Sequence, residues 1–360
     1  MILQNHFSEE KNRNIYKRRI LALQNLLPTW NVQACIVESK VDLYYLTGLE
    51  LSLGRLLIGV HDVTLLVDGR YFDVCKEVNI VEVDHLTDEN ANRFFSSKGI
   101  QKVAFDAGKT SVLEYEKIKK QLSVFLEPRF SLLQSLRSCK DERELELMRK
   151  SARLNWKGFL HICEILREGI TEKEVAWEYE SFIREQGAEG LAFSPIIAFG
   201  PNGAKPHHRC TDATLKNGDA VLIDIGATLE KYQSDMTRVA FFGDGSSEIK
   251  RLYEIVQKSQ KEALQFCKPG ISIGTLDKVA REVMRKEEVE PLFLHSLGHG
   301  IGLETHEYPR IRETGEHKNV LLEEGMVITI EPGLYIPGMG GVRYEDTVVI
   351  TKSGFENLYS

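Results

Sequence analysis

A glycine-rich stretch at residues 295–308 (HSLGHGIGLETHEY) places three histidines within twelve positions. His295 and His299 are four residues apart, a spacing that would put both on one face of a helix and suggest a zinc site. Three glycines alternate between positions 298 and 302, and each costs a helix roughly 1 kcal/mol relative to alanine. A strand or a glycine-rich loop is therefore the better prediction. We expect the path of the backbone to bring the histidines together, and the glycines to leave room for backbone and substrate.

The length and charge of the chain limit its fold and its partners. At 360 residues it exceeds the size at which one hydrophobic core usually stops growing, so two domains are expected. A net charge of −7 gives no electrostatic footprint for nucleic acid. The longest apolar runs, such as residues 56–60, are too short to span a bilayer. The first residues lack the apolar core of a signal peptide, and six scattered cysteines indicate reduced thiols, so we predict a cytoplasmic protein.

Short predicted elements alternate through the first third of the chain. The spacing of apolar residues predicts a helix at residues 15–27. Strands are predicted at residues 34–37, 55–60 and 63–67, and the last two form a hairpin around His61 and Asp62. Further strands are expected at residues 80–83 and 102–105, and further helices at residues 89–97 and 111–122. This alternation predicts a small α/β domain.

A charged segment at residues 137–144 (RSCKDERE) marks the predicted domain boundary, which we place between residues 137 and 138. Asp141 and Glu144 resemble a capping box that opens a long helix. Two later turns, at residues 169–171 (GIT) and 270–272 (GIS), each follow one predicted helix and precede another. They indicate two similar halves, and a chance match of short pieces is the alternative.

Two aspartates accompany neighbouring apolar strands. Asp224 lies near the end of the apolar run at residues 220–226, a poor place for a charge unless something pairs with it. Asp235 lies eleven residues later and leads into another apolar strand. Two strands joined by a turn would bring these carboxylates side by side. Taken alone, however, Asp224 is better explained as a turn residue and Asp235 as an ion-pair partner of Arg238.

Two glutamates occupy similar places further along the chain. Glu331 ends a strand that stops at Pro332, and Glu345 lies in the last predicted strand, at residues 342–350. Because side chains alternate along a strand, only one of the adjacent Glu345 and Asp346 can point into a shared site. For each glutamate alone, a surface salt bridge is the simpler interpretation.

Taken together, the four carboxylates and a glycine-flanked histidine predict a metal site. Such a cluster of like charge is costly unless cations are present. Two divalent ions would balance four negative charges. Oxygen-rich ligation with one imidazole suits Mn, Co or Zn more than it suits a thiolate-bound structural zinc. A two-metal site of this kind lowers the pKa of a bridging water and is suited to amide hydrolysis.

These segments resemble the pita-bread metallopeptidases, which include proline-specific aminopeptidases, Xaa-Pro dipeptidases and methionine aminopeptidases. The matching pieces occur in the family's order: NGAKPHH, DIGA with YQSDMTR, HSLGHGIGLETHEYPR, ITIEPGLYIPG and GVRYEDTVV. Residues 15–137 resemble the N-terminal domain of the proline-specific branch, including YYLTG and DGRY. The resemblance implies an α+β protein, with a creatinase/prolidase-like α/β domain at residues 1–137 and a catalytic pita-bread domain of pseudo-twofold repeated halves at residues 138–360. It also implies a homodimer.

The resemblance implies a role for each matching residue. The expected metal ligands are Asp224 on one ion, His299 and Glu331 on the other, and Asp235 and Glu345 bridging both. His207, His306 and His295 match histidines that contact substrate or stabilise the tetrahedral intermediate, Glu331 also helps to take a proton from the bridging water, and Tyr335 and Arg343 match supporting or substrate-pocket positions. His208 is interpreted as a solvated neighbour of His207. Manganese is the expected metal, with cobalt or zinc as alternatives.

Two positions depart from the family pattern. Tyr344 stands where an aliphatic residue is commoner, and Phe199 stands where a small polar residue is more usual. Neither removes a ligand. The five intact ligand positions argue against the metal-free relatives of this fold, the creatine hydrolases and the histone-binding chaperone domains.

The leading prediction is an Xaa-Pro aminopeptidase, whose substrates are peptides with proline in second position. A bridging hydroxide on two divalent metals would cleave the bond before proline. An Xaa-Pro dipeptidase is the alternative, and it must also capture the carboxylate on the product side. A methionine aminopeptidase is disfavoured because such enzymes usually lack a comparable N-terminal domain. A non-catalytic peptide-binding module of the same fold is the remaining hypothesis.

Overall fold

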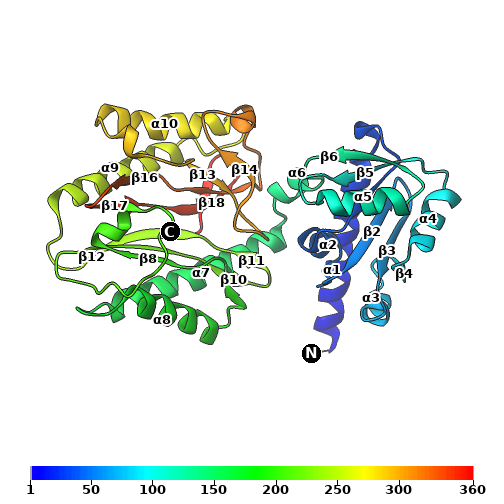
Figure 1. Ribbon diagram of the computed structural model, residues 1–360, viewed down its shortest axis with the longest axis horizontal. Coiled ribbons are helices and arrows are strands. Elements are labelled where there is room, and N and C mark those ends of the chain that lie inside the picture. Colours follow the sequence, from blue (N-terminus) through cyan, green and yellow to red (C-terminus); the bar gives the residue numbers. More distant parts are fainter. Residues whose placement is uncertain (1, 360) are drawn as a thin grey trace. The chain divides into compact units, whose positions relative to one another are not determined.

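The computed structural model describes the backbone of residues 2–359 and the side chains from residue 13 onward. The chain divides into two compact units with the boundary between Arg137 and Ser138 (Figure 1). Among the described residues, no helix is long and apolar enough to cross a membrane.

The N-terminal unit contains a six-stranded sheet in the order β4-β3-β2-β1-β5-β6. Its strands are β1 (Ala34–Val37), β2 (Gly54–Gly59), β3 (Val63–Val67), β4 (Glu82–His85), β5 (Lys102–Asp106) and β6 (Phe125–Arg129). Its helices are α1 (Ile2–Leu26), α2 (Lys40–Thr47), α3 (Phe72–Val78), α4 (Asp88–Ser97), α5 (Val112–Gln121) and α6 (Gln134–Ser138). Strands β2 and β3 pair antiparallel, which confirms the predicted hairpin. Helix α1 includes most of the predicted first helix but begins earlier.

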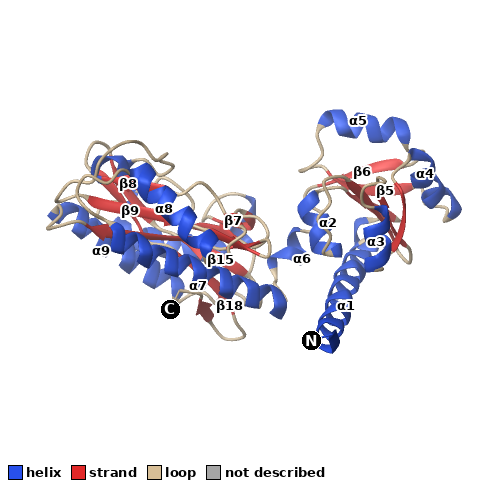
Figure 2. Cartoon of the chain, turned by 90° about the horizontal axis from the view of Figure 1, so that it is seen from below, coloured by secondary structure: helices blue, strands red, loops and turns tan. Residues whose placement is uncertain are grey.

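The C-terminal unit consists of two successive sets of helices and strands along the chain; Figure 2 shows its helices in blue and its strands in red. The first set is α7 (Glu142–Ile165), α8 (Glu172–Glu185), β7 (Gly190–Leu191), β8 (Ile196–Phe199), β9 (Ala220–Ile225), β10 (Ala227–Leu229), β11 (Tyr232–Gln233) and β12 (Met236–Phe241). The second is α9 (Ser247–Leu264), α10 (Ile273–Lys286), β13 (Gly298–Gly300), β14 (Glu307–Ile311), β15 (Val327–Ile330), β16 (Gly333–Ile336), β17 (Gly340–Arg343), β18 (Asp346–Ile350) and β19 (Phe355–Asn357). In Figure 1, α9 and α10 lie on one side of the strands and α7 and α8 on the other. The predicted capping box at the start of α7 is confirmed, because Asp141 accepts hydrogen bonds from two backbone N–H groups, including that of Glu144.

The two sets repeat the same local structure, which confirms the predicted similar halves. Gly169 and Gly270 both adopt a φ of +84°, a left-handed conformation that glycine adopts at little cost. The N–H of Gly169 donates to the carbonyl of Leu215, and the N–H of Gly270 donates to the carbonyl of Leu322. In the first half, the next strand β9 pairs antiparallel with β12. In the second half, the corresponding strand β15 pairs antiparallel with β18.

The two halves meet at the ends of these strands. An isolated antiparallel bridge between Thr237 and Glu345 connects the sheet of the first half to that of the second. Asp224 lies near the end of β9, and Glu331 comes directly after β15. Asp235 and Glu345 come directly before β12 and β18. The strand topology therefore brings all four carboxylates to the junction of the halves.

Candidate metal centre and substrate pocket

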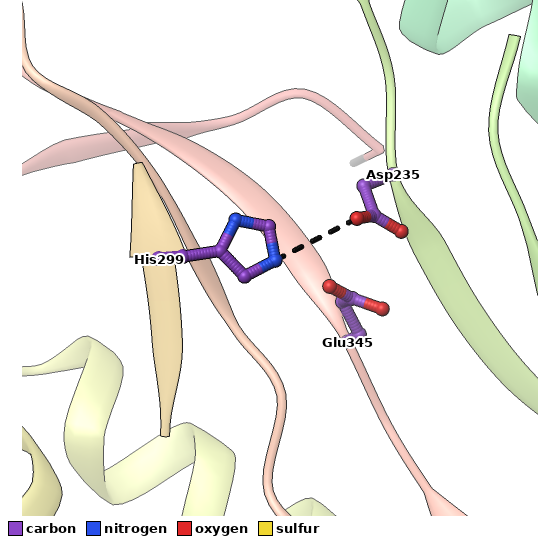
Figure 3. A group of neighbouring side chains, drawn as sticks. All are labelled: Asp235, His299 and Glu345. Carbon is purple, nitrogen blue, oxygen red and sulfur yellow. Dashed lines mark ion pairs between the residues drawn. The ribbon is translucent and has the colours of Figure 1, made fainter. Parts of the chain in front are cut away.

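Three buried side chains form the centre of the site (Figure 3). Asp235, His299 and Glu345 each offer one ligand atom, and these atoms lie within 4.8 Å of one another. His299 comes from β13, whereas the two carboxylates come from the segments that lead into β12 and β18. The ring Nε2 of His299 is 3.8 Å from Oδ2 of Asp235, and Figure 3 marks this pair.

The other two predicted ligands adjoin this group. Oε1 of Glu331 lies 3.5 Å from Nε2 of His299. Oδ1 of Asp224 is buried and has no hydrogen-bond partner within residues 2–359, although buried polar atoms are rarely left without one. All five residues line one cavity of about 970 Å³. The structure therefore brings the predicted ligands together and leaves a carboxylate oxygen available at the cavity.

The orientation of the His299 ring suits a metal ligand. Its Nδ1 lies 3.0 Å from the carbonyl oxygen of Gly300. Because a carbonyl can only accept, Nδ1 carries the proton and Nε2 keeps its lone pair toward the carboxylates. Burial, together with His306, lowers the pKa of His299 to about 3. The ring is therefore neutral, the form that binds metal.

The carboxylates of the cluster disfavour each other's charge. Burial and the nearby Glu345 raise the pKa of Asp235 and of Glu331 well above their usual values. Burial and Asp224 raise the pKa of Glu345 to about 8. Like charges in a desolvated cluster produce these directions, and an added cation reverses them. The donor set of carboxylate oxygens with one imidazole thus fits divalent cations.

Arg343 forms hydrogen bonds that link two of the predicted ligands, Asp224 and Glu345, the second of them through Thr237. One guanidinium nitrogen, Nη2, lies 2.5 Å from Oδ2 of Asp224, and Nη1 donates to the Tyr335 hydroxyl at 2.7 Å. Its Nε donates to Oγ1 of Thr237 at 3.0 Å, and that hydroxyl donates to Glu345 at 2.7 Å. Arg343 therefore orients two of the predicted ligands. Thr237 was not predicted, because its sequence position gives no sign of the partners that β17 and β18 bring to it.

His295 lies in the cavity wall and forms a hydrogen bond with the Tyr335 hydroxyl. Its Nδ1 donates to the carbonyl of Ser296 at 2.9 Å, and its Nε2 lies 2.9 Å from the Tyr335 hydroxyl. Burial raises the pKa of Tyr335 to about 12, and burial with the nearby Arg343 lowers the pKa of His295 to about 3. A neutral imidazole thus accepts a hydrogen bond from a phenol. Tyr335 is only 1% exposed and lies outside the cavity lining, so it supports His295 and Arg343 instead of lining the substrate pocket.

His207 and His306 lie at the exposed part of the same cavity. The rings of His299 and His306 are 4.2 Å apart between centroids. Partial burial, with His207 nearby, lowers the pKa of His306. All three predicted substrate-side histidines thus line the space next to the carboxylates.

Comparison with known proteins identifies the family. The model of metallopeptidase family M24 matches residues 146–352, and the model of the creatinase/prolidase N-terminal domain matches residues 19–139. The chain belongs to metallopeptidase family M24. The fold prediction, an α/β domain followed by a pita-bread domain, is confirmed by the solved relatives. Membership implies divalent metal ions, and the buried cluster offers their ligands.

Relatives of this metallopeptidase match over nearly their whole length. The Xaa-Pro dipeptidase of Pyrococcus horikoshii is 34% identical over 351 residues, which are 96% of this chain and 97% of the relative. The solved Xaa-Pro dipeptidase of Bacillus anthracis is 30% identical with a TM-score of 0.92, covering 96% of this chain and 98% of that one. The solved X-Pro aminopeptidase of Thermotoga maritima is 32% identical with a TM-score of 0.84, covering 92% and 96%.

Two polar contacts of the metallopeptidase correct the sequence interpretation. His208, expected to be solvated, is buried, and its Nε2 lies 2.8 Å from a carboxylate oxygen of Glu172. Arg238 pairs with Asp346 at 2.5 Å, so the alternative explanation of Asp235 as the ion-pair partner of Arg238 is wrong, whereas the metal-site prediction for Asp235 is unaffected. Glu172 was missed because a glutamate in the first turn of a helix usually faces solvent.

The alternation predicted for the last strand is confirmed in the metallopeptidase. Glu345 faces the cluster, whereas its neighbour Asp346 points away to Arg238. The guanidinium of Arg238 also lies 4.2 Å from the ring centroid of Tyr344, a favourable cation–π distance. The unusual tyrosine at this position therefore packs on the far side of the ligands.

The raised carboxylate pKa values predict how the metal-free metallopeptidase responds to pH. A carboxyl whose folded pKa is raised favours folding below its unfolded pKa, about 4.3 for glutamate, and this contribution is lost as the pH rises toward about 8 for Glu345. Each pH unit in that window costs up to about 1.4 kcal/mol per raised group. With chelator, the melting temperature should fall between pH 5 and pH 8, and saturating Mn²⁺ should flatten the curve. If the melting temperature depends on pH in the same way with chelator and with Mn²⁺, the raised carboxylate pKa values are contradicted.

Proposed function

We propose that this metallopeptidase is an Xaa-Pro dipeptidase, which hydrolyses dipeptides that end in proline. The similarity to Xaa-Pro dipeptidases over almost the full length of both chains carries this proposal. It favours the dipeptidase alternative over the leading prediction of an aminopeptidase. The similar X-Pro aminopeptidase of Thermotoga maritima keeps the aminopeptidase as the second candidate.

The site residues divide the chemistry between binding metal and handling substrate. Asp224, Asp235, His299, Glu331 and Glu345 would hold two divalent ions. Bound there, the ions supply a water that is nucleophilic at neutral pH and polarise the scissile carbonyl. Glu331, only partly exposed at the cavity, is proposed to take the proton from that water. We propose that His306, whose ring centroid lies 4.2 Å from that of His299, stabilises the oxygen that gains charge, and that His207 and His295 hold the peptide.

Two arginines offer a place for the product-side carboxylate. Arg209 and Arg310 are exposed and line the same cavity as the ligands. Nε of Arg310 lies 3.5 Å from Oγ of Ser296, which leaves the guanidinium with further donors. Arginine pairs well with carboxylates, and an Xaa-Pro dipeptide carries its carboxylate directly on the Cα of the proline ring. A longer peptide has no charge at that place.

The substrate test compares Xaa-Pro, Xaa-Pro-amide and Xaa-Pro-Xaa peptides, each with Mn²⁺ and with chelator. A dipeptidase should prefer the free dipeptide by at least ~10-fold in kcat/KM, since hydrogen bonds to charged groups contribute about 1.5–3 kcal/mol. Equal or faster cleavage of the longer peptides would instead establish the aminopeptidase. No turnover with metal would leave only the peptide-binding module.

The arginine variants refine this test. Arg310→Gln should reduce the preference for the free dipeptide over its amide by about 10-fold, because the variant loses a charged partner of the carboxylate. Arg312→Gln is the matched control, since Arg312 is exposed on the same segment but lies outside the cavity lining. If both variants keep the wild-type preference, Arg310 does not bind the carboxylate.

We further propose manganese as the metal, a homodimer as the assembly and the cytoplasm as the location. The donor set supports the metal, and the family resemblance supports the assembly. Metal analysis of the purified protein and sedimentation velocity test the first two.

A further inference from the structure

Glu172 is a buried carboxylate with an unusual number of donors. It is the first residue of α8 and is fully shielded from solvent. Its two oxygens accept five hydrogen bonds, from the N–H of Phe199 at 2.9 Å, Nδ2 of Asn202 at 2.9 Å, Nε2 of His208 at 2.8 Å, and the N–H and Oγ1 of Thr211 at 2.8 and 2.7 Å. All of these donors belong to the segment at residues 199–211, which we call the His207 segment.

The surroundings of Glu172 favour its charged form. Burial alone would raise its pKa, but hydrogen bonds from His208, Phe199, Thr211 and Asn202 outweigh burial and lower it. Its place at the N-terminus of a helix also favours a negative charge. A buried carboxylate is costly without such partners, so the five donors and the carboxylate stabilise one another in a single arrangement.

The His207 segment forms a wall of the cavity that the five predicted metal ligands line. Five consecutive residues of the segment, 206–210, line that cavity. The segment includes the short 3-10 helix η2 (Gly200–Ala204) and otherwise lacks regular structure between β8 and β9. Glu172 contacts it at both ends and beside His207. Few backbone ladder bonds fix such a segment, so side-chain anchors must do so.

The other side of the His207 segment rests on β17. Nη1 of Arg343 lies 3.4 Å from the carbonyl of Pro206, the residue before His207. Gly203 and Gly341 pack so closely that a Cβ at Gly341 would collide with the carbonyl of Gly203. The segment is therefore clamped between the start of α8 and the strand that carries Arg343.

The second half of the unit anchors a cavity histidine in a comparable way. Arg281 on α10 donates to the carbonyl of His295 at 2.7 Å. Its Nε pairs with the buried Asp277, one helical turn earlier, at 3.1 Å. In each half, a charged residue on the second helix thus holds the backbone beside a histidine of the cavity.

We propose that Glu172 is a positioning residue that fixes the His207 segment so that His207 meets the substrate. His208 is part of the anchor and does not contact substrate. The inference rests on the proposed function in one respect, the role of His207 as a substrate contact. Glu172 itself does not line the cavity, and it acts through the segment.

The test is a double-mutant cycle between Glu172→Gln and His207→Ala. Glutamine has the same shape, but its amide group faces donors where an acceptor is needed. Glu172→Gln should lower kcat/KM for a dipeptide by about 10- to 100-fold, as loss of an orienting partner commonly does, with unchanged Mn²⁺ content. In the His207→Ala background the same change should cost clearly less than in wild type, because one of the cavity side chains that the segment carries is absent.

Glu174→Gln is the control on the same helix. Glu174 is exposed and forms the capping box with Thr171, so its loss weakens the start of α8 without touching the His207 segment. It should lower the melting temperature slightly and leave kcat/KM unchanged. Equal losses from Glu172→Gln in both backgrounds, or no loss from His207→Ala, would overturn the proposal.

Hydrogen exchange separates this proposal from the proposed function. Amide exchange within residues 199–211 should accelerate at least ~10-fold in Glu172→Gln and stay unchanged in Glu174→Gln, whether or not dipeptides are hydrolysed. If wild-type protein fails to cleave any proline peptide, the function fails while the exchange result still stands. Unchanged exchange in Glu172→Gln overturns the positioning role even in an active dipeptidase.

Discussion

Asp235→Asn and Glu345→Gln should each reduce kcat/KM for proline dipeptides by roughly 10³-fold or more. Each change removes a charge and a ligand oxygen from the group that His299 completes. Bound divalent ions would supply several kcal/mol of transition-state stabilisation, and each 1.4 kcal/mol corresponds to a tenfold change in rate. Steady-state kinetics with metal analysis of the same samples measures both the rate and the loss of bound ions.

The same variants should have the opposite effect on the metal-free protein. Because burial and Glu345 raise the pKa of Asp235, replacing the carboxylate with a neutral amide relieves repulsion. Asp235→Asn should therefore melt at a higher temperature than wild type in chelator at pH 8. A variant that loses both activity and metal-free stability would point to misfolding instead.

Asp346→Asn is the matched control for Glu345→Gln. Asp346 is the next residue, but it pairs with Arg238 on the far side of the strand. Its replacement should cost stability because it removes one partner of a buried ion pair, while the number of bound ions stays the same. Wild-type activity in Asp235→Asn or Glu345→Gln would rule out the two-metal mechanism.

A shared metal cluster was predictable because the sequence context of the carboxylates carries a constraint, whereas the assignment of each ligand rested on the family resemblance. A carboxylate at the end of an apolar strand needs a partner. Shared divalent cations would serve as that partner for all four carboxylates and would also bind His299. The repeat was also visible in short turns, since Gly169 and Gly270 adopt the same positive φ. These patterns are local in the sequence, so they can be recognised without knowledge of the tertiary contacts.

The supporting contacts were not predictable, because they join residues that are distant in sequence. Glu172 meets His208 36 positions later, and Arg238 meets Asp346 108 positions later. The sequence identifies Glu174 as the third helical residue of a capping box with Thr171, but it gives no sign of a partner for Glu172. Only the fold shows that one faces the His207 segment and the other faces solvent.

Gly298→Ala should strongly destabilise the stretch that carries His299. A Cβ at this position would collide with the backbone carbonyl of Thr329 on β15, and the hydroxyl of that threonine also accepts the N–H of His299 at 3.1 Å. Because a backbone carbonyl cannot move aside as a flexible side chain can, the strand must shift. Overpacking of this kind costs about 1–3 kcal/mol or more.

A shift of β13 should also impair metal binding, because it moves the His299 ring away from Asp235 and Glu345. We expect Gly298→Ala to unfold at lower denaturant and to bind Mn²⁺ at least ~10-fold more weakly, measured by chemical unfolding and by titration calorimetry. Gly354→Ala is the control, since a Cβ there would have no neighbour within 4 Å. At Gly300 a Cβ would likewise collide with a backbone carbonyl, that of Tyr308. If Gly298→Ala matches Gly354→Ala in both measurements, these glycines do not serve close approach of the strands, and the space they leave would have to serve the substrate.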